Sequence, residues 1–184
     1  NRGVTQRCDI VGITGHSSVN LAIYDARIVV EKRGRETGGI VTSDGERICQ
    51  RKKTGLVRDV FLQRHMLRLR GNAGLGHVRY PTAGCSSSSE AQPLYVNSPF
   101  GVLLAHNGNL TNAAELDRML VGKDRRHLHT GSDSEVLLNV LAHELGDAND
   151  EQRKPKGVVE AIPKLHARCS GAYAGGAMVT GYGL

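Results

Sequence analysis

The stretch CDIVGITG (residues 8–15) places a cysteine directly before an apolar run that is typical of a buried strand. Such a cysteine is either an ordinary packing residue or a nucleophile at the amino terminus of a processed chain. Residues 1–7, NRGVTQR, stand in front of it, so its amine is free only if they are removed. Whether Cys8 is interpreted as a packing residue or as a nucleophile therefore depends on which other residues lie near the start of this strand.

Apolar periodicity and turn residues predict the remaining elements. We expect helices over 18–31 (capped by Ser17 or Ser18), 57–68, 112–121, 132–145 and 157–168, and strands at 38–43, 73–80, 100–110 and 171–181. Asp44-Gly45 predicts a hairpin, and Ser132 with Glu135 predicts a capping box. The order lacks the βαβ alternation of a parallel sheet, so we predict an α+β fold of antiparallel sheets flanked by helices.

Length and composition are those of one globular domain with its own core. The formal net charge of +6 indicates either a solvated basic surface or contact with phosphates or an acidic partner. The chain has no Trp, two Phe and five Tyr, which argues against a stacking platform for single-stranded nucleic acid and leaves binding to a duplex backbone open. No apolar run approaches the roughly 18 residues of a membrane span, so no membrane contact is expected.

The four cysteines, Cys8, Cys49, Cys85 and Cys169, do not have the spacing of a zinc site. Their density does not suggest a disulfide scaffold either. We therefore expect no metal and identify no cofactor in this segment.

Polar residues stand at the ends of apolar segments in HVRYPTAG (77–84), AHNGNL (105–110) and GSDSE (131–135), as Cys8 does at the first strand. Cleavage of an amide by a thiol needs a nucleophile, a base and donors to the tetrahedral oxyanion. If Cys8 were the first residue, its own α-amine, with a pKa of about 7.7–8.0, would serve as the base. Asn107 and the backbone amide of Gly108 would form the oxyanion hole.

Two further residues suit the recognition of an amino acid. Arg79 would hold a carboxylate through two hydrogen bonds, and Asp133 would hold an ammonium group. A substrate with both groups and an amide to cleave is glutamine or asparagine. Each residue also has an ordinary interpretation: Asn-Gly is a common turn, Asp133 suits the helix dipole, and Arg79 suits a surface ion pair.

Five segments closely resemble the glutaminase domain of the amidophosphoribosyltransferases: CDIVGITG, IYDARIVVEKRG, GNAGLGHVRYPTAG, SSSEAQPLYVNSPFGVLLAHNGNLTNAAEL and SDSEVLLN. These enzymes are class II glutamine amidotransferases of the N-terminal nucleophile hydrolase superfamily. They move ammonia from glutamine to phosphoribosyl pyrophosphate in purine biosynthesis. The resemblance runs from Cys8 to about Gly183 and implies a four-layer αββα sandwich of two antiparallel sheets.

The resemblance also implies roles for individual residues. It makes Cys8 the nucleophile, Arg33 the arginine beside it, Asn107 and Gly108 the oxyanion donors, and Arg79, Thr82 and Asp133 the glutamine-binding groups. It makes residues 8–184 a glutaminase domain that is incomplete at its C-terminal end, with the phosphoribosyltransferase domain absent. Some family members hold an iron–sulfur cluster, but we find no ligand set for one here.

Three local features depart from the family pattern. Arg7 is still joined to Cys8, which removes the free amine unless residues 1–7 are a propeptide. Asp9 stands where the family has glycine, and a carboxylate beside the thiol disfavours the thiolate. Residues 32–36 read KRGRE where the family has His-Arg-Gly-Gln-Asp.

Two hypotheses follow. The first is a glutaminase that becomes active once Cys8 is exposed and that works with a phosphoribosyltransferase domain. The second is a catalytically silent relic that serves as a structural subunit of a larger assembly, such as a ribonucleoprotein. The resemblance implies an oligomeric, cytoplasmic protein, and the basic pI and the start at Asn1 leave an organellar, mitochondrial location as the alternative.

Overall fold

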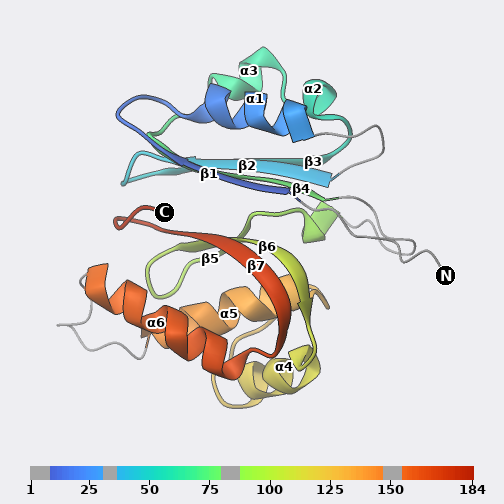
Figure 1. The fold of residues 1–184 in the computed structure, drawn as a ribbon, viewed down its shortest axis with the longest axis vertical. Helices are drawn as coiled ribbons and strands as arrows, with labels where there is room; N and C mark the ends of the chain where they lie inside the picture. The colour runs from blue at the N-terminus through green and yellow to red at the C-terminus, as the bar shows by residue number, and fades with distance from the viewer. Residues whose placement is uncertain (1–8, 31–36, 80–87, 147–154) are drawn as a thin grey trace.

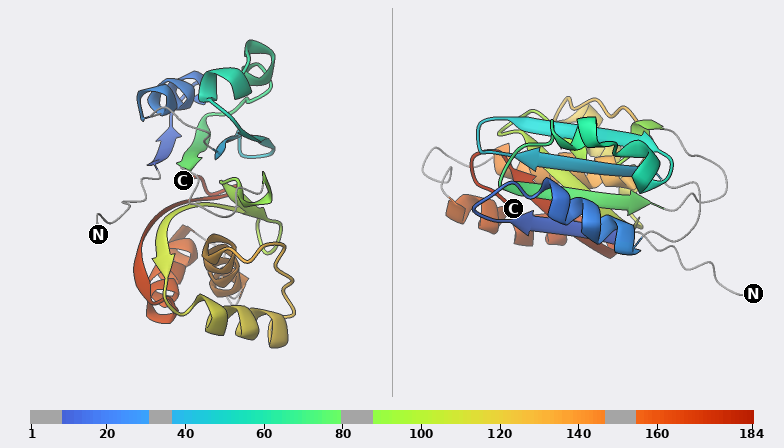
Figure 2. Two further views of the ribbon diagram at one scale, coloured as in Figure 1. Left: turned by 90° about the vertical axis from the view of Figure 1, so that its right-hand side faces the viewer. Right: turned by 90° about the horizontal axis from the view of Figure 1, so that it is seen from above.

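The computed structural model describes residues 9–30, 37–79, 88–146 and 155–184. Two antiparallel sheets pack face to face, and helices cover the outer face of each, which gives four layers (Figure 1). The first sheet has the strand order β1-β4-β2-β3 and the second has the order β5-β6-β7. The two halves lie one above the other in the turned view as well (Figure 2). The prediction of an α+β sandwich of two antiparallel sheets is therefore confirmed.

The first sheet is formed by the N-terminal part of the chain. Its strands are β1 (Asp9–Thr14), β2 (Thr37–Ser43), β3 (Ile48–Thr54) and β4 (Ala73–Arg79). β2 and β3 form the predicted hairpin, in which the Asp44 carboxylate accepts hydrogen bonds from the backbone N–H groups of Glu46 and Arg47. β4 lies between β1 and β2 and is hydrogen-bonded to both of them along nearly its whole length.

Three helices cover the outer face of this sheet: α1 (Asn20–Val30), α2 (Val57–Val60) and α3 (Gln63–Met66). α1 lies close to β4 because Gly76 has no side chain, and a Cβ there would come within 2.6 Å of the Ile23 side chain. The helix buries Ile23 and Arg27, and Val19 just before it is buried too; the Arg27 guanidinium lies 4.6 Å from the centre of the Phe61 ring. A buried arginine on this face is a residue that the apolar pattern did not predict.

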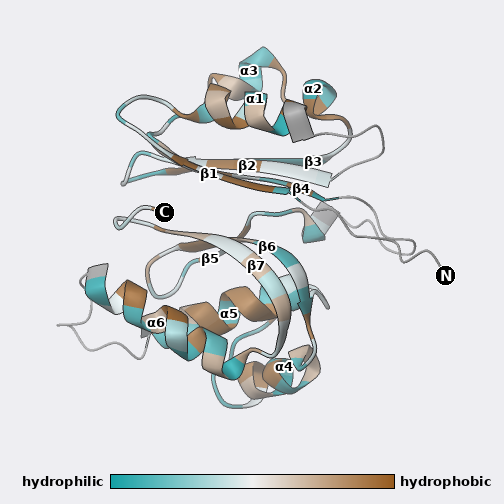
Figure 3. Cartoon of the chain, in the orientation of Figure 1, coloured by the Kyte–Doolittle hydropathy of each residue, from teal (hydrophilic) through white to brown (hydrophobic). Residues whose placement is uncertain are grey.

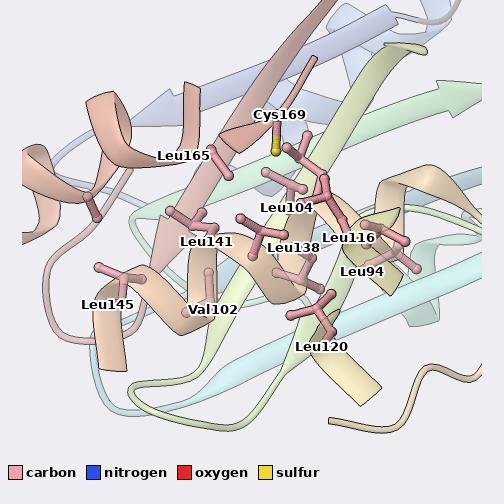
Figure 4. Packing of buried hydrophobic residues seen from close by; sticks show 14 of the residues in the cluster. Leu94, Val102, Leu104, Leu116, Leu120, Leu138, Leu141, Leu145, Leu165 and Cys169 are labelled. Atoms are coloured by element: carbon pink, nitrogen blue, oxygen red, sulfur yellow. The ribbon is translucent and has the colours of Figure 1, made fainter. Parts of the chain in front are cut away.

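The second sheet and the second helical layer come from the rest of the chain. The strands are β5 (Leu94–Val96), β6 (Val102–Leu110) and β7 (Gly171–Val179), and the helices are α4 (Ala113–Gly122), α5 (Asp133–Gly146) and α6 (Pro155–Arg168). A single-turn 3-10 helix, η1 (Ser88–Glu90), precedes β5. The larger hydrophobic core lies in this half, where leucines of α5 pack against β6, α4 and α6 (Figure 4). α5 is accordingly among the most apolar helices (Figure 3).

Several local predictions need correction. The helix expected over 57–68 is two short helices, and Leu67, within the expected helix, lies outside both and is 66% exposed. The hydroxyl of Ser18 donates to the Asn20 side chain instead of capping α1. β5 was not predicted. Asn107 and Gly108 do not form a turn, because they lie within β6 and pair with Ala174 and Tyr173 of β7.

Within the described ranges, no helix combines the length and the apolar character needed to cross a membrane.

Candidate functional site

Three strand ends meet at one edge of the first sheet. β1 begins at Asp9, β2 begins at Thr37 and β4 ends at Arg79. The register pairs Asp9 with Val78 and Thr37 with Arg79, so all three ends lie side by side. Three of the predicted site residues, Cys8, Arg33 and Thr82, lie outside the described residues.

Arg79 forms an ion pair at this edge. Its Nη1 lies 2.7 Å from Oε2 of Glu90, and the two side chains are 27% and 20% exposed. The contact joins the end of β4 to η1, and it is the ordinary interpretation that the sequence left open. Glu90 was not predicted as a site residue, because nothing in the sequence around it points to a partner eleven residues upstream.

Gly108 adopts a backbone conformation that only glycine tolerates at this place. Its φ is +134°, and a Cβ would collide with the backbone carbonyl oxygen of Ala172 on β7. Asn107, the residue before it, is half-buried, and Gly108 is exposed. Gly108 thus combines a close approach to β7 with a positive φ, at a point where the strand remains paired.

Asp133 joins the start of α5 to the end of β6. Its Oδ2 accepts a hydrogen bond of 3.0 Å from the backbone N–H of Leu110, and its Oδ1 lies 3.8 Å from Nδ1 of His106. The side chain is 24% exposed, so part of the carboxylate still faces outward. Asp133 is the first residue of α5, where a negative charge also suits the helix dipole.

A buried polar network lies behind Asp133. The side chain of Gln92 accepts the backbone N–H of His106 at 2.6 Å and donates to Oγ of Ser134 at 3.0 Å. Oγ of Ser134 lies in turn 2.8 Å from Nδ1 of His106. This network was not predicted, and the only signal for it was a histidine at the end of the apolar run FGVLLAH.

Two buried histidines in the sandwich are held neutral. Burial, together with the Arg27 and Arg79 guanidinium groups, lowers the pKa of His77 from 6.5 to about 3. Burial also lowers the pKa of His106, and the Asp133 carboxylate acts in the opposite direction. The interior beside the strand ends is therefore free of positive charge from these two rings near neutral pH.

The predicted capping box at α5 is only half present. Oγ of Ser132 accepts the backbone N–H of Ser134, as an N-cap does. The Glu135 carboxylate instead accepts the backbone N–H groups of His129 and Thr130, at 2.8 and 2.7 Å. Burial raises the pKa of Glu135, but these hydrogen bonds outweigh it, and the pKa lies below its ordinary value. Glu135 thus holds the segment that leads into α5.

Among the described residues, no three or more His, Cys, Asp or Glu side chains are grouped closely enough to hold a metal ion.

A family model described as a glutamine amidotransferase domain matches residues 63–157, just over half of the chain. The amidophosphoribosyltransferase of Pseudomonas aeruginosa is 56% identical over 177 residues, which is 96% of this chain and 35% of that protein. That of Escherichia coli is 53% identical over 178 residues, with the same two shares. The chain thus spans about a third of the length of these curated relatives.

Solved structures give the same result. One described as the allosteric regulatory enzyme of purine biosynthesis matches with a TM-score of 0.78 at 32% identity, over 93% of this chain and 35% of that chain. The glutamine phosphoribosylpyrophosphate amidotransferase from B. subtilis, complexed with ADP and GMP, matches with a TM-score of 0.77 at 31% identity over the same shares. These likenesses confirm the resemblance stated from the sequence and, with it, the predicted four-layer sandwich.

Proposed function

Because the chain belongs to the glutamine amidotransferase domain family, we propose that it hydrolyses the side-chain amide of glutamine and supplies the ammonia for purine biosynthesis. The observation that carries the proposal is the edge at which β1 and β2 begin and β4 ends. Cys8 directly precedes Asp9, the first residue of β1, and residues 31–36 directly precede β2. The segment that contains Thr82 follows Arg79, so one edge connects to all three predicted residues that lie outside the described ranges.

In the proposed reaction, the Cys8 thiol attacks the amide carbon of glutamine and passes its proton to the α-amine of the same residue. The oxyanion that forms is stabilised by the side-chain amide of Asn107 and the backbone N–H of Gly108. The C–N bond breaks, ammonia leaves with the transferred proton, and a thioester remains. Water then hydrolyses the thioester to glutamate and restores the thiol.

Substrate recognition uses charges on both sides of this centre. Arg79 and Thr82 hold the α-carboxylate of glutamine, and Asp133 holds its α-ammonium group. Glu90 fixes the direction of the Arg79 guanidinium through the 2.7 Å ion pair and leaves its other donors for the substrate. Arg33 is the arginine beside the nucleophile.

The proposed unit is residues 8–184, with residues 1–7 as a propeptide. The ammonia acceptor is phosphoribosyl pyrophosphate, handled by a phosphoribosyltransferase domain as in the longer amidophosphoribosyltransferases. Because this chain spans 35% of the P. aeruginosa relative, glutamine hydrolysis is the part of the reaction that it is proposed to carry.

The test compares a chain that begins at Cys8 with one that keeps residues 1–7, by measuring glutamate and ammonia released from glutamine. We expect activity from the first and not from the second, because only the first has a free α-amine as base. Cys8→Ala in the shorter chain should abolish both products. An inactive shorter chain that is folded and binds glutamine would overturn the proposal and favour the catalytically silent subunit.

A further inference from the structure

A cavity of about 270 Å³ lies between β3 and α3, on the helical side of the first sheet. It is lined by Cys49, Gln50, Arg51, His65, Arg68 and Leu69. Cys49 packs against the hydrophobic cluster beneath α1–α3, and Arg51, two residues along the strand, faces the same side. The second sheet lies on the other side, so this cavity is separate from the proposed glutamine site (Figure 1).

Several arginine side chains lie in or beside the cavity, and none of them forms an ion pair with a carboxylate of the described residues. Within the described residues, no carboxylate oxygen lies within 4.0 Å of the charged nitrogens of Arg51, Arg64 or Arg68. Nε of Arg51 is moreover buried without a hydrogen-bond partner among those residues. A buried donor that is left unsatisfied is costly, and a turn of the Arg51 guanidinium toward an anion in the cavity would satisfy it.

His65 responds to the same charges. Arg64 Nε donates to its Nε2 at 3.4 Å, so Nδ1 carries the proton and donates to the carbonyl oxygen of Val60 at 3.0 Å. Partial burial and the neighbouring guanidinium group of Arg51 lower the pKa of His65. An anion in the cavity would favour the imidazolium, and Nε2 would then become a further donor to it.

We propose that this cavity binds the phosphate group of a small molecule. Arginine forks match phosphate oxygens, and a phosphate monoester carries about −1.5 to −2 charges at neutral pH, which suits two arginines beside a histidine. The volume is slightly below the range of about 300–1,000 Å³ that is typical of pockets for drug-sized ligands. The lining contains no Phe, Tyr or Trp on which a nucleobase could stack, so a small phosphate ester fits better than a nucleic acid strand.

The test titrates the 184-residue chain with inorganic phosphate at constant ionic strength, held with chloride, and follows His65 and the Arg51 Nε–H group by NMR. We expect saturable shifts and a rise in the pKa of His65 on binding. Arg51→Gln and Arg68→Gln should each weaken binding about tenfold or more, because each removes a charge-assisted hydrogen bond. Arg68 is exposed, so its substitution leaves the fold intact.

The matched control is Arg118→Gln, which removes the same charge from α4, where Nε of Arg118 donates to the Ala114 carbonyl. Equal weakening by this variant, or equal shifts with chloride alone, would mean diffuse attraction and would overturn the proposal. So would a duplex oligonucleotide that binds with dependence on Arg51 and Arg68 while phosphate gives no saturable shift. Cys8→Ala should leave phosphate binding unchanged, which separates this proposal from glutamine hydrolysis.

Discussion

Nδ1 of His106 lies 2.8 Å from Oγ of Ser134, and this contact joins β6 to the first turn of α5. His106 directly precedes Asn107, and Ser134 directly follows Asp133. The contact therefore fixes the spacing between the proposed oxyanion donor and the proposed partner of the substrate ammonium group. Buried polar contacts of this kind help to hold a site in one geometry, although Nε2 of His106 is buried without a hydrogen-bond partner among the described residues.

Ser134→Ala should therefore destabilise the protein and weaken glutamine binding. The substitution removes the acceptor of Nε2 of Gln92 and the hydroxyl beside Nδ1 of His106, at a cost of about 1–3 kcal/mol in the free energy of unfolding. Urea unfolding measures this cost, and we expect KM for glutamine to rise more than kcat falls, because Asp133 is the proposed partner of the substrate ammonium group. Ser170→Ala, at an exposed position, is the control.

Ser134→Thr keeps the hydroxyl and should restore part of the loss. If Ser134→Ala changed neither stability nor KM, the network would not position the site. If stability fell while KM stayed constant, its role would be structural only.

Elements set by residues close together in the sequence were predicted, and those set by contacts between distant residues were not. The β2–β3 hairpin and β6 were predicted because their signals, a turn residue pair and an apolar run, are local. The helix over 57–68 was predicted as one element from its apolar residues, whereas the structure buries Val60 on α2, Phe61 between the two helices and Met66 on α3.

Parts of the site depend on contacts that no local pattern encodes. Arg79 meets Glu90, and Gln92 meets Ser134 across 42 positions of sequence. Residue chemistry suggested binding roles for Arg79 and Asp133, and the family resemblance, which carries long-range information that periodicity lacks, assigned them and added Thr82. The Glu135 half of the capping box was wrong because the carboxylate found nearer donors in the segment before the helix.

Gly108→Ala should impair both folding and catalysis. A residue with a Cβ is strained at a φ of +134°, by about 1–3 kcal/mol, and the added atom would collide with the Ala172 carbonyl. At Gly122, the last residue of α4, an added Cβ would have no other side chain or distant backbone within 4 Å. Gly122→Ala should therefore leave the stability of the protein unchanged or raise it by up to about 1 kcal/mol. Thermal unfolding of the two variants checks this contrast, and similar behaviour would contradict it.

Burial of the neutral His77 ring should make the free energy of unfolding decrease at acidic pH. In the unfolded chain its pKa is near 6.5, whereas burial and the guanidinium groups of Arg27 and Arg79 lower it to about 3 in the folded protein. Between these two pKa values the unfolded chain binds one more proton than the folded protein. The contribution of His77 to the free energy of unfolding is therefore complete above pH 6.5 and is lost as the pH falls. The slope for one proton is about 1.4 kcal/mol per pH unit.

The measurement is urea unfolding at pH 6.5 and pH 5. We expect His77→Gln to lose about 1–2 kcal/mol less than the unaltered chain over this interval. His106 contributes in the same direction but is present in both proteins, so the difference belongs to His77. His16→Gln, at an exposed position, should keep the slope of the unaltered chain, and an unchanged slope in His77→Gln would refute the assignment.

Asp133→Asn should raise KM for glutamine and leave kcat nearly unchanged. The asparagine oxygen still accepts the Leu110 backbone N–H, so the free energy of unfolding should change little. The lost charge removes a charge-assisted hydrogen bond to the substrate ammonium group, which is worth about 1.5–3 kcal/mol, or about a 10-fold to 150-fold rise in KM. This contact is equally strong before and during the reaction, which is why kcat is spared. Asp117→Asn on α4 is the control for the loss of charge alone. An equal rise in KM for that variant would contradict a substrate-binding role for Asp133. So would a fall in kcat without a rise in KM for Asp133→Asn.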